Sequence, residues 1–110
     1  LLGHQPYKVY GTIHYGTIVN HQSSGGSYQL PASTFSHDYH LFTTEWDSIG
    51  MKWYVDGGLY HTETHAKPFD KIFHLLLNVA VGGNWPGSPD GTTIFPQKMY
   101  VDYVRVYEKN

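Results

Sequence analysis

The stretch that decides the fold is IGMKWYVDGGLYHTET, residues 49–64. Met51, Trp53 and Val55 alternate with more polar residues, which is the pattern of a strand with one buried face. Asp56-Gly57 follows, and these two residue types tolerate the positive φ angles of a tight hairpin. The stretch therefore predicts two antiparallel strands joined by a short turn. The predicted strands are 49–55 and 59–64.

Strand-like composition recurs along the chain, and no segment has convincing helical periodicity. Further strands are predicted at 8–15, 39–46, 73–81 and 99–107. The segment 73–81, FHLLLNVAV, is almost continuously apolar, as expected of a central strand covered on both faces, although a buried helix has similar composition. Its flanking Pro68 and Gly82-Gly83 favour a strand. The polar segment 20–27 is predicted to be a surface loop, and 82–96 a long loop of the kind that often carries function.

Composition agrees with an all-β protein. Aromatic residues make up 16% of the 110 residues, and there are 12 Gly and 6 Pro. The formal net charge is −2 without a basic stripe, so nucleic acid is not expected as a partner. No apolar run is long enough to suggest a membrane span, and the first eight residues do not resemble a signal peptide. A sandwich with a ligand cleft usually needs more strand than this, so part of the core is expected outside the chain.

Two groups of residues suggest catalysis or metal binding at first sight. His61 and His65 flank a glutamate, but that glutamate is two residues after the first histidine, and the segment leaves a hairpin rather than forming a zinc-protease helix. Glu45 and Asp47 could share a strand face as the paired carboxylates of a glycosidase. However, Asp47-Ser48-Ile49-Gly50 is typical of a turn, which would carry Asp47 off the sheet. The chain therefore offers no persuasive nucleophile.

Sugar binding is better supported, because aromatic faces stack on pyranose rings and short polar side chains hold the hydroxyls. Trp85 lies in the Gly/Pro-rich loop, where the alternative is an aromatic folded back over the sheet edge. Asn78 is polar within an apolar segment and needs a partner or a cleft. Thr12 and His14 share one face of their strand, again with a structural role as the alternative. Trp46 and Trp53 are predicted to be core residues.

Several motifs together resemble one family, the laminarinases of glycoside hydrolase family 16, and their order and spacing match over nearly the whole chain. The motifs are YGTIHYG (10–16), FTTEW (42–46), WYVDGGLYHT (53–62), PFD (68–70), LLLNVAVGGNWPG (75–87), FPQKM (95–99) and VDYVRVY (101–107). The resemblance implies a concanavalin-like jelly-roll sandwich of two antiparallel sheets, with glucan lying across the concave sheet. Residues 1–110 would be the C-terminal part of one such domain and supply about half of it.

The family's catalytic signature, Glu-Ile-Asp-Ile-Met-Glu or a close variant, is absent from the sequence. In family members it is followed by residues similar to Leu1-Leu2-Gly3-His4, so the nucleophile and the acid/base are expected upstream of Leu1. Three explanations remain: a fragment of an enzyme, one half of a split domain, or a sugar-binding homologue without chemistry. The resemblance favours the fragment, which is expected to be inactive alone.

Residue by residue, the resemblance implies that His14 lies beside the acid/base, with Thr12 one pleat away in the cleft. Asn78 would face the substrate and Trp85 would belong to the cleft wall. Asp102 matches a position that holds a structural calcium ion in many relatives, although the other ligands would come largely from upstream. No cofactor is required otherwise.

The implied activity is hydrolysis of internal β-1,3 or mixed β-1,3/1,4 bonds of β-glucan, with retention, when the upstream catalytic strand completes the domain. The missing N-terminal part of the domain is then a partner of this chain. Secretion is implied because polymeric glucans lie outside cells. The alternative is a non-catalytic glucan-binding or recognition module.

Overall fold

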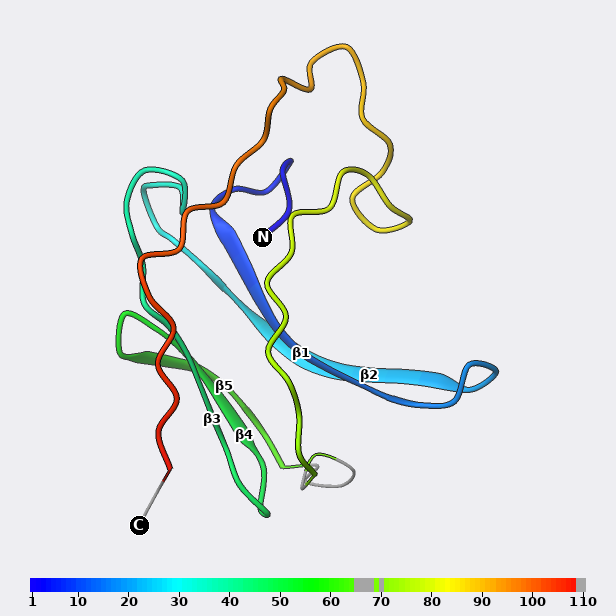
Figure 1. Cartoon of the computed structure of the whole chain (residues 1–110), viewed down its shortest axis with the longest axis vertical. Helices are drawn as coiled ribbons and strands as arrows, with labels where there is room; N and C mark the ends of the chain where they lie inside the picture. The colour runs from blue at the N-terminus through cyan, green and yellow to red at the C-terminus, as the bar shows by residue number, and fades with distance from the viewer. Residues whose placement is uncertain (65–68, 70, 109–110) are drawn as a thin grey trace. The chain divides into compact units, whose positions relative to one another are not determined.

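The structure, a computed structural model, describes residues 1–64, 69 and 71–108. It divides into two compact units, Leu1–Phe73 and His74–Asn110. All five strands of the described residues lie in the first unit (Figure 1). The prediction of a single domain is not tested by this division and stays a prediction.

The first sheet of the Leu1–Phe73 unit is a long hairpin. Strand β1 (Lys8–Gly16) pairs antiparallel with β2 (His21–Gln29) over nine residue pairs, from Lys8↔Gln29 to Gly16↔His21. The predicted strand 8–15 is thereby confirmed. The predicted loop 20–27 is wrong: the connecting loop is only 17–20, and the polar, Gly-rich segment after it is extended because every residue pairs with β1.

The second sheet has the order β3-β4-β5. Its strands are β3 (Phe42–Trp46), β4 (Met51–Val55) and β5 (Gly58–Glu63), all antiparallel to their neighbours. The predicted tight turn is confirmed, since Asp56 and Gly57 have φ values of 50° and 83°. The predicted strand 39–46 is shorter than expected, because residues before Phe42 do not pair with β4.

The two sheets pack face to face around a small core. The inward face of β1 presents Val9, Gly11 and Ile13, which alternate with more exposed residues. One cluster joins Val9 with Phe35 and Val55, and a second joins Ile13 with Trp53 and Phe69. A register shift at Trp53/Tyr54 leaves Tyr60 without a strand partner, and its side chain packs against both clusters.

Glycine allows the two sheets to approach closely. A Cβ atom on Gly11 would lie 2.7 Å from Cγ of Trp53, and one on Gly26 would lie 2.6 Å from Nδ1 of His61. Both distances are too short for a real Cβ contact, so the aromatic rings occupy the space that a side chain would need. The hairpin β1-β2 is thus seated directly on the aromatic residues of β4 and β5.

Trp53 is buried as predicted, but the prediction that Trp46 is a core residue is wrong. Trp53 is 9% exposed, whereas Trp46 is 48% exposed. Trp46 lies on β3, which pairs only with β4 in this sheet. Phe42 at the other end of β3 is likewise 50% exposed. Hydrophobic composition alone does not distinguish this strand from the covered one.

The His74–Asn110 unit is extended and carries no strand among its described residues. The strands predicted at 73–81 and 99–107 are therefore not formed, and most of their apolar side chains are exposed, Leu76 by 77% and Val106 by 69%. The reason is that an extended segment becomes a strand only when a neighbouring strand takes its backbone hydrogen bonds. The minority alternative, a buried helix over 73–81, is not formed either.

Candidate functional site

The outward face of the β1-β2 hairpin carries the first two predicted site residues. Thr12 and His14 are both exposed, while their neighbours Gly11 and Ile13 are buried. The prediction that Thr12 and His14 share one strand face is thus confirmed. Across the hairpin, Thr12 pairs with Gly25 and His14 pairs with Ser23, so this face is open and polar.

Tyr10 extends the same face toward the start of β1. Its hydroxyl donates a hydrogen bond to Oε1 of Gln5 over 2.5 Å, and Nζ of Lys8 lies 5.1 Å from its ring centroid. The ring is therefore held in place by a polar contact and a cation–π contact. The resulting row, Tyr10, Thr12 and His14, combines an aromatic side chain with two short polar side chains, the residue types that bind sugars.

Sequence reasoning missed His21 as a neighbour of His14. In the structure, Nδ1 of His14 lies 3.1 Å from Nε2 of His21, and the rings are stacked with centroids 5.2 Å apart. The sequence predicts His21 in the surface loop 20–27 because that segment is polar. Only its pairing with β1 brings His21 opposite Gly16 and thus beside His14.

Asn78 and Trp85 lie in the second unit and are both exposed. Trp85 is 64% exposed, in a loop closed by two backbone hydrogen bonds between Gly83 and Gly87. Gly83 and Gly87 have φ values of 145° and 85°, which favour glycine. Trp85 is presented to solvent rather than packed in a core, while contact of Asn78 and Trp85 with sugar stays a prediction.

The carboxylates of the described residues do not form a facing pair on the hairpin site. Asp47 is a turn residue as expected: its Oδ1 accepts hydrogen bonds from the amides of Ile49 and Gly50. Glu45 is exposed on β3, where Oε2 accepts a hydrogen bond of 2.8 Å from the Tyr54 hydroxyl. This bond to a carboxylate raises the pKa of Tyr54. Glu45 and Asp47 therefore have local structural partners.

Glu63 is the buried carboxylate of the described core, at 6% exposure. Its Oε2 accepts a hydrogen bond from the Ser24 hydroxyl on β2, and its Oε1 accepts one from the Thr64 amide. Because Glu63 is on β5, the Ser24 bond ties the two sheets together. This carboxylate is inside the sandwich, on the opposite side of the hairpin from Thr12 and His14.

The metal predictions rest on residues that the structure describes only in part. Asp102 is exposed, and the described residues contain no group of three or more His, Cys, Asp or Glu that could hold a metal ion. His65, the second histidine of the zinc-like spacing, lies outside the described residues. Calcium at Asp102 stays a prediction. In the described part of the chain there is also no helix able to cross a membrane.

Comparisons with known proteins identify the class to which this sandwich and its polar hairpin face belong. The profile of the glycosyl hydrolases family 16 matches residues 1–105. The chain belongs to this family, and its fold is the all-β jelly roll of two antiparallel sheets.

Particular relatives agree with this assignment. Glucan endo-1,3-beta-glucosidase A1 of Niallia circulans is 43% identical over 124 residues, covering 97% of this chain and 18% of that protein. The endo-beta-1,3-glucanase of Pyrococcus furiosus matches in structure with a TM-score of 0.75 and 40% identity, over 87% of this chain and 40% of that one. The laminarinase catalytic domain of Thermotoga maritima MSB8 matches with a TM-score of 0.67 and 42% identity. That match covers 86% of this chain and 42% of the laminarinase domain. This chain therefore spans less than half of each.

Proposed function

We propose that this chain is part of a retaining β-glucanase that cleaves internal β-1,3 or mixed β-1,3/1,4 bonds. The observation that carries the proposal is the open polar row of Tyr10, Thr12 and His14 on the outer face of a hairpin whose inner face is packed. The names of the relatives, which include an endo-1,3-beta-glucosidase and a laminarinase, support β-glucan as the substrate class.

In the complete domain, two carboxylates from the rest of the protein perform the double displacement. One attacks the anomeric carbon, and the other protonates the leaving oxygen and then activates water. This chain contributes positioning: Thr12 and His14 bind sugar hydroxyls on the hairpin, and Asn78 and Trp85 bind the substrate from the second unit. Three carboxylates of this chain already have hydrogen-bond partners within the fold: Glu45, Asp47 and Glu63. This supports the proposal that the catalytic pair comes from outside this chain.

The remainder of the same domain is the proposed partner of the exposed apolar segments 73–81 and 99–107. Two observations support this. The segments are strand-like in composition yet have no hydrogen-bonded neighbour among the described residues. The chain also spans only 40–42% of the solved relatives. A calcium ion at Asp102, if the domain binds one, takes its other oxygen ligands from that remainder. We propose an extracellular location because polymeric glucan is found outside cells.

The test is to determine the coding sequence that precedes Leu1 and then to assay the completed domain on laminarin. A Glu-x-Asp-x-x-Glu motif and release of reducing sugar are expected, while the 110 residues alone should release none. In the completed domain, His14→Ala should lower kcat/KM by about tenfold to hundredfold, since a polar contact at the reacting sugar is lost. Glu45→Gln is the matched control and should leave the rate unchanged.

Two results would contradict the proposal. Wild-type-like sugar release by the 110 residues alone, abolished by Glu45→Gln, would place catalysis on β3. Tight laminarin binding by a completed domain that lacks the paired glutamates would instead support the non-catalytic recognition module.

A further inference from the structure

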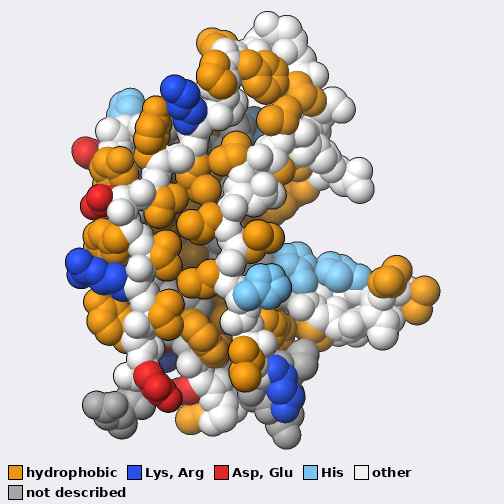
Figure 2. Space-filling view, viewed as in Figure 1, with side chains coloured by type: hydrophobic (Ala, Val, Ile, Leu, Met, Phe, Trp, Pro, Cys, Tyr) orange, Lys and Arg blue, Asp and Glu red, His pale blue; other side chains and the backbone are white. Residues whose placement is uncertain are grey.

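Two histidine rings meet at the loop end of the β1-β2 hairpin, next to the connecting residues 17–20. Nδ1 of His14 and Nε2 of His21 are 3.1 Å apart, and the ring planes differ by 23°. Both side chains are exposed, and histidine side chains are visible together on this hairpin in Figure 2. The register of the hairpin brings the two rings together, because the pairing of Gly16 with His21 places His14 and His21 diagonally across the two strands.

The separation of the two nitrogens matches that of two ligands on one metal ion. Imidazole nitrogens bind first-row divalent metals at about 2.0–2.1 Å, so two of them at angles between square-planar and tetrahedral are about 2.8–3.4 Å apart. The observed 3.1 Å lies inside this range. The present stacked arrangement is that of a hydrogen-bonded pair, and because both side chains are exposed, their rings are free to turn so that both lone pairs face one ion.

The surroundings are compatible with a cation. The two rings border an open depression whose other lining residues are Tyr15, Gly16, Thr17 and Ile18. None of these carries a positive charge that would repel a divalent ion. The open side leaves the remaining coordination positions to water, and imidazole ligands favour Cu²⁺, Ni²⁺ or Zn²⁺ over the oxygen-preferring Ca²⁺ and Mg²⁺.

We propose that His14 and His21 form a bidentate site for a divalent first-row transition metal ion, with Cu²⁺ bound most tightly. Binding requires both imidazoles to be neutral. The proton that one ring shares with the other in the hydrogen bond moves to the second nitrogen of its own ring, so both facing lone pairs become available. The site differs from the zinc-like spacing of His61 and His65 and from Asp102, and it does not depend on glucan.

The test is a titration of the full chain with Cu²⁺ alone, following the ring signals of its histidines by NMR. The signals of His14 and His21 should broaden first and saturate at one ion per chain. His14→Ala and His21→Ala should each lower the Cu²⁺ affinity by about tenfold or more, because one of two linked ligands is lost. His37→Ala is the matched control: His37 is also exposed, its ring contacts Ser33 3.3 Å away, and the affinity should not change.

Three outcomes would overturn the proposal. The first is the absence of saturable Cu²⁺ binding to the wild type. The second is wild-type affinity in both hairpin variants, and the third is an equal loss in His37→Ala. Circular dichroism of each variant separates loss of the site from loss of the fold, and His21→Gln is a second variant that keeps a polar side chain on β2. A Ca²⁺ titration should leave the His14 and His21 signals unchanged.

Discussion

The two units of this chain both contain apolar segments, but these are partly buried in the first unit and exposed in the second. In Leu1–Phe73, Val9 and Ile13 of β1 and Trp53 and Val55 of β4 are at most 9% exposed. In His74–Asn110, the run Leu75–Leu77 is 59–77% exposed. Figure 2 shows hydrophobic side chains spread over the face in view. Among the described residues, the first unit has paired strands and two facing sheets that bury part of their side chains, and the second unit has no paired strand.

This difference explains what an apolar pattern can and cannot predict. Pairing satisfies the backbone donors and acceptors, and only a paired sheet can bury its side chains against a second layer. Changes in the first unit should therefore cost more stability than matched changes in the second.

The largest effect is expected from truncation of the aromatic residue at the centre of the first unit. Trp53 is 9% exposed and packs with Ile13 and Phe69. Trp53→Ala should lower the free energy of unfolding by about 3–5 kcal/mol, because a large buried ring is replaced by a cavity. Leu76→Ala, at a position 77% exposed, should change it by less than about 0.5 kcal/mol. Urea denaturation measures both, and equal losses would contradict the contrast between the units.

Hydrogen exchange should separate the two units without any mutation. Amides of β1, β2 and β4 that bond within the sheets should exchange at least about a hundredfold more slowly than those of 74–81 and 99–107, because exchange from a paired strand requires local unfolding. Mass spectrometry of peptic fragments resolves these segments. Strong protection of 74–81 in the isolated chain would show that this segment finds a strand partner after all.

Glycine at the interface between the sheets offers a smaller and more local test. A Cβ on Gly11 would lie 2.7 Å from Trp53 and 2.8 Å from the Tyr60 hydroxyl. Gly11→Ala should therefore cost about 1–3 kcal/mol, as overpacking does. The control is Gly91→Ala in the second unit, where nothing lies within 4 Å of the added atom. Thermal unfolding compares the stability of the two variants. If Gly11→Ala is as stable as the wild type, the sheets can separate at little cost.

Much of the first unit could be predicted because its signals are local. The turn at Asp56-Gly57 depends on two residue types that accept positive φ, and β4 depends on the alternation of Met51, Trp53 and Val55. The shared face of Thr12 and His14 follows from the two-residue period of a strand.

The errors all depend on partners that a local pattern does not reveal. The sequence predicts a loop over 20–27 because these residues are polar, yet β2 pairs along its whole length with β1. The sequence predicts Trp46 in the core, although β3 lacks the cover that β4 has. The contact of His21 with His14 follows from the register of the hairpin, which the sequence of β2 does not specify.

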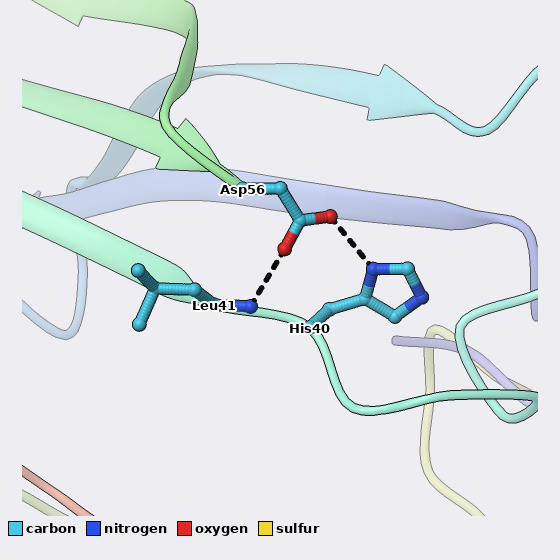
Figure 3. Close-up of polar contacts among 3 residues, drawn as sticks. All are labelled: His40, Leu41 and Asp56. Atoms are coloured by element: carbon cyan, nitrogen blue, oxygen red, sulfur yellow. Dashed lines mark hydrogen bonds and ion pairs between the residues drawn. The ribbon is translucent and has the colours of Figure 1, made fainter.

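The smallest predicted effect concerns the clamp that joins the turn after β4 to the residues before β3 (Figure 3). Oδ2 of Asp56 accepts a hydrogen bond of 2.8 Å from Nδ1 of His40, and Oδ1 accepts one of 2.8 Å from the Leu41 amide. Both bonds lower the pKa of Asp56 from its ordinary 3.8, and the bond from His40 has the larger effect. The clamp is in the unit with the paired strands, so breaking it tests how far that unit depends on polar contacts.

The pKa of Asp56 is lower in the folded chain than in the unfolded one. Its contribution to the stability of the fold is therefore fully present above the unfolded pKa and is lost as the pH falls through the folded pKa. The side chain is 49% exposed, so solvent screening limits the contribution to less than about 1 kcal/mol. Asp56→Asn keeps a residue that tolerates the φ of 50°. It should be less stable than wild type at neutral pH and nearly equal to it in acid, as measured by urea denaturation at each pH. Asp38→Asn, at an exposed carboxylate, is the control, and a difference that stays constant into acid would show that the clamp acts through turn geometry rather than charge.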